Sequence, residues 1–290
     1  MTKVVITGAT GFLGSELVAY FAAEGWQVTG LCRTPKKSKN LHVTYKAYDM
    51  MGDVDENIFK DADYLVHTAF IKYDQKHPDA FQLNVAAAQK LLATAKKHKL
   101  KKPLFISSMS AHAGAVSVYG KQKLAVEKLF VKDGGVALRS GMIIGNGGIV
   151  AQMVDFMRSK HMVPLIGGGK QPLQIIGVYD LVKAIDKSLT LKNVTGVLTV
   201  ATPQVYTYKS FYQSIARRLG IRVFFVPVPF WLLLNTMRLI SYLHIPLAVN
   251  EDNLLGLKML KAAKTSDDLS RLHMTVDGLE KALSNVNLTK

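Results

Sequence analysis

The sequence predicts an α/β fold, in which a doubly wound parallel sheet carries helices on both of its faces. Two observations predict it: short apolar segments alternate with helical patterns along the chain, and the first apolar segment breaks into three glycines spaced three apart. Strands and helices in this succession form right-handed crossovers. With 290 residues, of which 49% are hydrophobic, the chain can bury a full core, either as one large unit or as a main domain with a smaller appendage.

The expected elements follow one another in βα order. The first strand ends at Thr7 and runs through a tight turn into a helix. Polar or small residues close several later strands, at the carboxyl edge where parallel sheets bind ligands. We expect further strands at 27–33, 43–50, 62–69, 103–108 and 136–139, and helices at 81–97 and from 117 onward.

Each of the three glycines after the first strand has its own physical role. Gly8 permits a turn that a side chain would hinder, and Gly11 lets the backbone approach a pyrophosphate. Gly14 lets the helix pack closely on the strand, and the N-terminus of that helix offers free N–H groups to an anion. The segment therefore predicts a dinucleotide cradle.

The end of the second expected strand indicates which dinucleotide binds. Arg33 stands there, where a carboxylate would hydrogen-bond the ribose 2′-hydroxyl of NAD. A guanidinium suits the 2′-phosphate of NADP instead, and Lys36, Lys37 and Lys39 lie nearby in the sequence. We therefore expect NADP(H) as the preferred cofactor, with NAD(H) as the alternative.

A tyrosine and a lysine four residues apart form the second constellation. In a helix, Tyr119 and Lys123 share one face. A free phenol has a pKa of about 10, and a nearby ammonium favours the phenolate, so the pair suits general acid/base work. Ser108, at the end of the preceding strand, can hydrogen-bond a substrate oxygen beside the tyrosine hydroxyl.

Together, the stretch from Thr7 to Gly14, Ser108 after its strand, and Tyr119 with Lys123 resemble the short-chain dehydrogenase/reductase superfamily. The resemblance is to its extended and atypical branch, which contains the NAD-dependent epimerase/dehydratase proteins, and it covers residues 1 to about 190. It implies a Rossmann-type sheet and a catalytic triad. In that triad Tyr119 is the general acid/base, Lys123 binds the nicotinamide ribose and lowers the tyrosine pKa, and Ser108 is the third member.

By the same resemblance, Ser107 and Ser110 are the fallback choices for the triad serine, and a larger set contacts the cofactor. The pair at 49–50 would touch the adenine, 67–69 would lie under the nicotinamide-side ribose, and Asn84 would support the active site. A turn cap, a semi-buried histidine and a helix cap are the competing interpretations. The implied cofactor residues are Gly8, Thr10, Gly11, Phe12, Leu13, Gly14, Arg33, Asp49, Met50, His67, Thr68, Ala69, Asn84, Tyr119 and Lys123.

A small, mostly helical C-terminal lobe is expected to bind the substrate. We assign residues 1–150 to the dinucleotide-binding domain, with 172–202 returning to its sheet, and 151–171 with 203–290 to the lobe. Asp180 is expected to cap the helix that follows it. The apolar segment 223–249 either lines a hydrophobic pocket, the favoured interpretation, or touches a membrane surface.

The formal net charge of +16 first suggests a nucleic acid or an anionic surface as partner. The cations are spread, and their densest cluster, 96–102, closes the expected helix 81–97, where positive charge suits the dipole, so we expect no nucleic-acid partner. The single cysteine, Cys32, fits a reducing cytosol. No close grouping of histidines has zinc spacing, so no metal is expected.

The expected protein is a cytoplasmic monomer or homodimer that acts on a small molecule. We expect hydride transfer between NADP(H) and a carbon that bears a carbonyl or hydroxyl group, with a slight preference for a reductase. Two alternatives stay open: a nucleotide-sugar epimerase or dehydratase that retains its cofactor, and a sensor or assembly protein that binds NADP(H) without turnover.

Overall fold

The main sheet of the computed structural model has seven strands, all parallel to their neighbours, in the order β11-β6-β5-β4-β1-β2-β3. The structure describes residues 1–74, 76–231, 233 and 251–286. The strands are β1 (Lys3–Thr7), β2 (Gln27–Cys32), β3 (Val43–Ala47), β4 (Tyr64–His67), β5 (Lys102–Ser108), β6 (Val136–Ser140) and β11 (Gly196–Val200). This sheet confirms the predicted doubly wound α/β fold.

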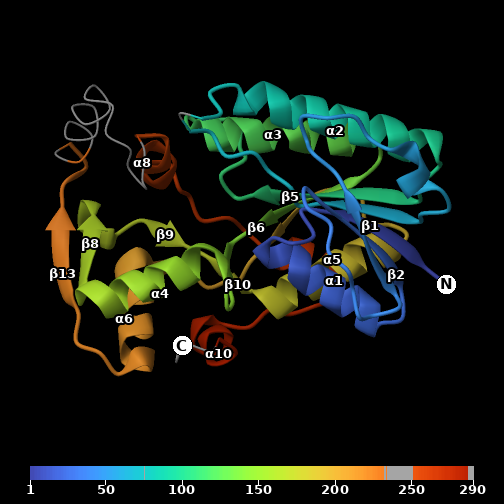
Figure 1. Cartoon of the computed structure of the whole chain (residues 1–290). Coiled ribbons are helices and arrows are strands. Elements are labelled where there is room, and N and C mark those ends of the chain that lie inside the picture. Colours follow the sequence, from blue (N-terminus) through green and yellow to red (C-terminus); the bar gives the residue numbers. More distant parts are fainter. Residues whose placement is uncertain (75, 232, 234–250, 287–290) are drawn as a thin grey trace.

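Two helices cover each face of the sheet (Figure 1). On one face lie α1 (Phe12–Ala23) and α5 (Val178–Thr190), and on the other α2 (Ala80–Lys97) and α3 (Val118–Lys132). Side chains of a strand alternate between the faces, so Ile6 packs in the core beneath α1 while its neighbour Val5 packs with Leu91 and Phe130 beneath α2 and α3. Both faces are therefore buried, which explains why β1 reads as a continuous apolar run.

The order of the strands places a topological switch point at β1. This strand pairs with β2 on one side and with β4 on the other, so the crossover connections on the two sides of β1 run in opposite directions. A crevice opens outside the carboxyl ends of strands at such a point, and ligands bind there in open α/β sheets. Thr7 and His67 are register partners at this edge.

The remaining elements form a lobe beside the sheet (Figure 1). Its helices and strands are β7 (Met142–Ile144), α4 (Gly148–Lys160), β8 (Met162–Ile166), η2 (Gly167–Gly169), β9 (Pro172–Leu173), β10 (Ile175–Gly177), β12 (Tyr206–Thr207), α6 (Tyr208–Leu219), β13 (Phe224–Val228) and α10 (Leu279–Ser284). Val154, Leu165, Phe211 and Leu283 meet in a separate apolar core. The short helices η1 (Glu56–Phe59), α8 (Glu251–Lys258) and α9 (Ser266–Arg271) pack against the main domain.

The basic cluster at 96–102 divides between two elements. Lys96 and Lys97 lie in the last turn of α2, as predicted, whereas Lys102 is a buried residue of β5. Its Nζ donates to the carbonyl oxygens of Ser188 (2.9 Å) and Leu191 (2.7 Å), at the end of α5. One cation of the cluster thus satisfies the last turn of a different helix. Within the described ranges, no helix combines the length and apolar character needed to cross a membrane.

Candidate functional site

The loop between β1 and α1 is shaped by glycine. Gly8 has a φ of +68°, and its carbonyl accepts a hydrogen bond of 2.9 Å from the Gly11 N–H. A Cβ on Gly14 would come within 2.1 Å of the Gly8 carbonyl oxygen, so only glycine allows this approach of helix to loop. The N-cap of α1 is Gly11, which has no side chain to accept hydrogen bonds from the first-turn N–H groups. The loop and the helix N-terminus therefore fit the pyrophosphate of a dinucleotide.

Phe12, at the first position of α1, packs into a second run of glycines. A Cβ on Gly145 or Gly147 would lie 2.6 Å from the Phe12 ring, and one on Gly148 would lie 3.0 Å from it. The segment 145–148, which leads into the lobe, thus packs closely around the Phe12 ring. Sequence reasoning placed Phe12 in the cofactor loop but missed this contact, because the partners are more than 130 residues apart.

His67 joins the ends of β1 and β4. Its Nδ1 lies 2.7 Å from the Thr7 hydroxyl, which also accepts hydrogen bonds from the N–H groups of Thr68 and Ala69. The Thr68 hydroxyl donates to the Thr7 carbonyl at 2.6 Å. Complete burial lowers the pKa of His67 to about 3, so its imidazole is neutral. His67 therefore supports the crevice from within, and Thr68 and Ala69 continue from it at the sheet edge.

Two adjacent serines at the end of β5 have different partners. The buried Ser107 hydroxyl donates to Glu127 at 2.8 Å, and Glu127 also accepts from Arg139, at 2.5 and 2.9 Å. Ser108 instead forms a side-chain hydrogen bond with Tyr119. Because neighbouring residues of a strand point to opposite faces, only one of the two can face the tyrosine. The geometry favours Ser108 over Ser107 as its partner.

Tyr119 and Lys123 lie near the start of α3 on one face, as their spacing predicts. Lys123 Nζ is 5.9 Å from the centre of the Tyr119 ring and donates to the Ile106 carbonyl at 2.8 Å. It also lies over the rings of Phe70 (4.4 Å) and Phe105 (4.7 Å). Carbonyl oxygens and ring faces both attract a cation, and among the described residues no carboxylate forms an ion pair with this lysine.

Burial shifts both side chains of this pair toward their neutral forms. It lowers the pKa of Lys123 to about 7, and it raises the pKa of Tyr119, against the opposing effect of the Ser108 hydrogen bond. The sequence predicts that the lysine, assisted by an oxidised nicotinamide, lowers the tyrosine pKa. In the chain alone, burial has the largest effect on this pKa and Lys123 is not among its causes, so the effect of the lysine in the cofactor complex stays a prediction.

Asp252 is a site residue that sequence reasoning missed. It lies on α8, and its carboxylate accepts one hydrogen bond from the backbone N–H of Val118 and another, of 3.1 Å, from that of Tyr119. N–H groups in the first turn of a helix have no partner within the helix, and Asp252 supplies one for these two. The Ser117 hydroxyl also caps α3, since it accepts a hydrogen bond from the Gly120 N–H. No motif marks Asp252, since only the fold brings it to the helix that carries the tyrosine.

Asn84 braces the segment that follows β4. Its side-chain amide donates to the carbonyls of Ile71 (2.8 Å) and Ala80 (2.7 Å), and its oxygen accepts from the Ile71 N–H at 3.0 Å. Asn84 is buried within α2 and does not cap it. Ile71 directly follows Phe70, whose ring packs edge-to-face on Tyr119 at 5.4 Å. The asparagine therefore holds the backbone behind a ring that contacts the tyrosine.

The residues expected at the adenine end lie after β2 and β3. Arg33 follows β2 and is exposed, and Lys36 lies over the Tyr45 ring at 5.1 Å. Asp49 is exposed and accepts a hydrogen bond of 2.9 Å from the Met51 N–H, so its carboxylate stabilises a turn, and Met50 lies within that turn. Thr10 and Gly11 are the exposed residues of the cradle and lie on the loop before α1.

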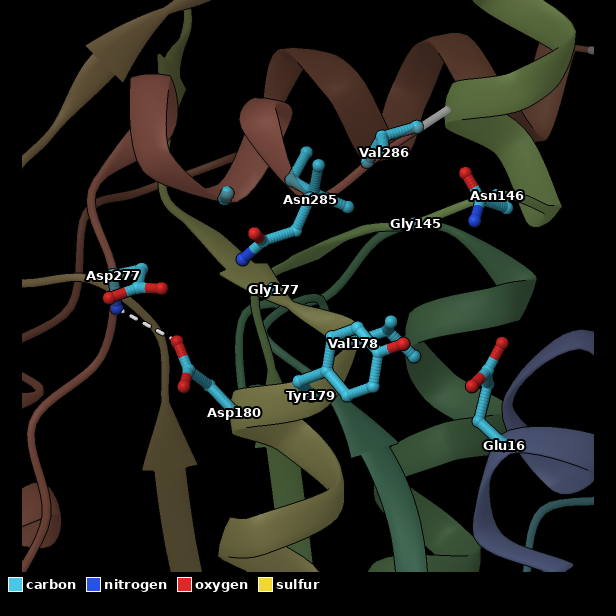
Figure 2. A pocket seen from close by; sticks show the side chains of 12 residues that line it. Glu16, Gly145, Asn146, Gly177, Val178, Tyr179, Asp180, Asp277, Asn285 and Val286 are labelled. Atoms are coloured by element: carbon cyan, nitrogen blue, oxygen red, sulfur yellow. Dashed lines mark hydrogen bonds between the residues drawn. The ribbon is translucent and has the colours of Figure 1, made fainter. Parts of the chain in front are cut away.

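Asp180 does not cap the helix that contains it, which corrects our expectation. The N-cap of α5 is Gly177, and Asp180 accepts a hydrogen bond of 2.8 Å from the Asp277 N–H instead (Figure 2). Both residues line a small pocket that Glu16 and Asn285 also border, and Ser108, Tyr119 and Lys123 are not among its lining residues. Asp180 therefore links α5 to the segment before α10.

Comparison with known proteins places the chain in a family. The model of the NAD dependent epimerase/dehydratase family matches residues 4–200. The chain belongs to this family, which confirms the resemblance found in its motifs. The Epimerase family protein YfhF of Bacillus subtilis (strain 168) is 24% identical, over 98% of this chain and 97% of that protein.

Solved structures share the fold over almost the whole chain. MoeE5 in complex with UDP-glucose and NAD has a TM-score of 0.76 and 20% sequence identity, covering 98% of this chain and 96% of that one. The UDP-glucuronic acid 4-epimerase of Bacillus cereus, in complex with UDP-glucuronic acid and NAD, also has a TM-score of 0.76, at 19% identity, covering 98% and 97%.

Proposed function

We propose that this chain is an NAD(P)-dependent oxidoreductase that moves a hydride between NADP(H) and a substrate carbon bearing a carbonyl or hydroxyl group. The observation that carries the proposal is the convergence of the half-buried Ser108 and Tyr119 with the buried Lys123 in one cluster beyond β5. This cluster lies at the same sheet edge as the glycine loop after β1. A proton donor and a dinucleotide cradle thus lie at one edge of the sheet, where ligands bind in folds of this kind.

The dinucleotide supplies the hydride when it is bound, and the glycine loop, Thr68 and Ala69 are the residues that would hold it. Tyr119 supplies the proton. Its raised pKa keeps the phenol protonated at neutral pH, so in reduction the hydroxyl can donate to the substrate oxygen as that oxygen gains negative charge. Ser108 would donate to the same oxygen and orient it toward the phenol.

Lys123 positions the phenol from one helical turn away. Its Nζ is fixed by the Ile106 carbonyl and by two aromatic rings, so the side chain has little freedom. With a pKa of about 7, the amine can gain or lose a proton near neutral pH. We assign to it the hydrogen bond to the nicotinamide ribose and the replenishment of the proton that Tyr119 gives up.

For the cofactor we propose a preference for NADP(H). What supports it is the cation Arg33 at the end of β2, where a carboxylate would instead favour NAD. Both of the similar structures named above hold NAD, so NAD(H) remains the competing choice.

A second candidate is a nucleotide-sugar epimerase or dehydratase that retains its cofactor. What favours it is that the structures with the same fold include a complex with UDP-glucose and a UDP-glucuronic acid 4-epimerase. In such a reaction the substrate is oxidised and then reduced within one site, so no cofactor is consumed.

The two candidates differ in cofactor balance, and this difference is the test. The purified protein is mixed with NADPH or NADH and a panel of aldehydes and ketones, and separately with NAD and UDP-glucose or UDP-glucuronic acid. A reductase consumes one reduced nicotinamide for each alcohol formed. Isomerised sugar nucleotide without net cofactor change would establish the second candidate instead. Tight cofactor binding without turnover on any substrate would contradict both and support a sensor.

A further inference from the structure

The two-stranded sheet of β8 and β13 has one covered face and one exposed apolar face. In its parallel register, Phe224 lies beside Met162 and Val226 beside Pro164. Phe224 is 76% exposed, Met162 41% and Val226 40%, and Pro164 is exposed as well. We call these four residues the β8–β13 face. It lies at the end of the lobe away from the main sheet (Figure 1).

The opposite face of the same two strands is ordinary core. Val163 and Leu165 alternate with the exposed residues of β8 and pack in the lobe core, with Phe225 of β13 against them. Strand alternation would place polar side chains on the outer face of a sheet that contacts only water. Here that face is apolar, which is typical of a binding surface.

Aromatic side chains continue the surface past the end of the strands. Phe230 lies against the turn after β8, because a Cβ on Gly167 would come within 2.5 Å of its ring. The next residue, Trp231, is 66% exposed. Tryptophan is enriched where protein meets the headgroup region of a membrane, since its ring is apolar and its N–H is polar.

Cations border both ends of the β8–β13 face. Lys160 and Arg222 are exposed; Lys160 lies two residues before Met162, and Arg222 lies two residues before Phe224. The Phe224 N–H donates to the His161 carbonyl at 2.9 Å, which joins the two chain segments at this end. Lys170 is exposed at the other end, after η2. From residue 187 to residue 250 the sequence contains no Asp or Glu. The surface is therefore apolar in its centre and positive at its rim.

We propose that the β8–β13 face, with Trp231 and its basic rim, docks on the surface of an anionic phospholipid membrane. The apolar side chains enter the boundary between headgroups and acyl chains, and Lys160, Lys170 and Arg222 contact the phosphates. This mode needs no spanning helix. It goes beyond the proposed enzyme activity and does not depend on it.

A second copy of the chain is the competing occupant, and charge disfavours it. In a symmetric pairing of two β13 edges, the positive rims at the strand ends would meet one another. Pro227 also removes a backbone N–H from β13, which weakens pairing along that strand. An anionic lipid surface offers acyl chains to the apolar centre and negative phosphates to the positive rim.

The test is cosedimentation of the full chain with vesicles of phosphatidylcholine alone or mixed with phosphatidylglycerol. We expect at least roughly tenfold stronger binding to the anionic vesicles, weakening as salt is raised. The Phe224→Asp and Lys160→Gln/Arg222→Gln variants should each lose at least roughly tenfold, although both keep residues 232–250 intact. Leu41→Asp, at a residue that is 96% exposed and lies between β2 and β3, is the matched control and should bind as the wild type does.

Three results would overturn the proposal. Equal binding to neutral and anionic vesicles would exclude the role of the rim, and full binding by both variants would exclude the face. A wild-type dimer in sedimentation velocity that Phe224→Asp converts to a monomer, without vesicle binding, would show that the face joins two copies. Melting temperatures of all variants, measured alongside, identify any loss that comes from unfolding, and in that case Val226→Ser replaces Phe224→Asp.

Discussion

The carboxylate of Asp252 accepts a hydrogen bond of 3.1 Å from the backbone N–H of Tyr119. The same carboxylate accepts from Val118, so a residue of the C-terminal segment caps the helix that presents the tyrosine. A Cβ on Gly256 would lie 3.5 Å from the Ser117 hydroxyl, which shows how closely α8 packs against the start of α3. The orientation of the tyrosine is thereby coupled to the docking of α8.

Replacing Asp252 with alanine should disturb both stability and turnover. Loss of a helix cap costs about 1 kcal/mol, and the freed first turn lets Tyr119 move. We expect a lower melting temperature and a lower kcat, with the Kd for the cofactor almost unchanged. Asp252→Asn keeps one acceptor oxygen and should recover part of both losses. An alanine variant with wild-type kcat and melting temperature would show that Asp252 has no positioning role.

The two serines of β5 should respond in opposite ways to substitution. Ser107→Ala removes a buried hydrogen bond to the Glu127 carboxylate, so we expect a loss of about 2 kcal/mol in the free energy of unfolding and little change in kcat. Ser108→Ala removes the partner of Tyr119 and should lower kcat by about 100-fold while the melting temperature stays near that of the wild type. Urea unfolding and steady-state kinetics measure both. The reverse pattern would move the catalytic role to Ser107.

The sequence predicted those parts of the fold and the site that depend only on residues close together in the chain. The turn at Gly8, the close approach at Gly14 and the shared face of Tyr119 and Lys123 all follow from spacing within one turn or one helix. The alternation of apolar segments with helical patterns also predicted the parallel sheet. Helices cover both faces of such a sheet, and its strands are therefore apolar on both sides.

Contacts between distant segments could not be predicted in this way. Asp252 reaches Tyr119 across 133 residues, and Asp180 accepts from Asp277 across 97, so neither partner leaves a pattern in the sequence. The rise of the Tyr119 pKa in the chain without its cofactor could not be predicted either, since it depends on how far the fold buries the phenol. Of the apolar segment 223–249, residues 232 and 234–249 lie outside the described part of the chain.

Arg33 should determine the choice between the two dinucleotides. Arg33→Ala should weaken NADP(H) binding by about 2 kcal/mol, roughly thirtyfold, because a charge-assisted contact to the 2′-phosphate is lost. NAD(H) has no such phosphate and should bind almost as before. Fluorescence titration measures both, with Lys96→Ala, an exposed cation at the end of α2, as the control. Equal losses for the two dinucleotides would contradict the preference for NADP(H).

Burial of His67 should make the protein sensitive to acid. Its pKa is about 3 in the folded chain and about 6.5 in the unfolded chain, so between these values only the unfolded chain binds the proton. The free energy of unfolding should therefore fall as the pH decreases from 6.5 toward 3, with this histidine contributing up to about 1.36 kcal/mol per pH unit. Urea unfolding at several pH values should show a shallower slope for His67→Gln. An unchanged slope would mean that His67 is protonated in the folded protein.

The most direct test of the account is the turnover number of Tyr119→Phe at saturating cofactor. This substitution removes one oxygen from a half-buried side chain and leaves its ring in place, so the Phe70 contact and the cofactor Kd should persist. Loss of a positioned proton donor should lower kcat by about 100- to 10,000-fold. If Tyr119→Phe instead reduces the substrate at the wild-type rate, another group delivers the proton, and the assignment of Tyr119 as the catalytic acid is wrong.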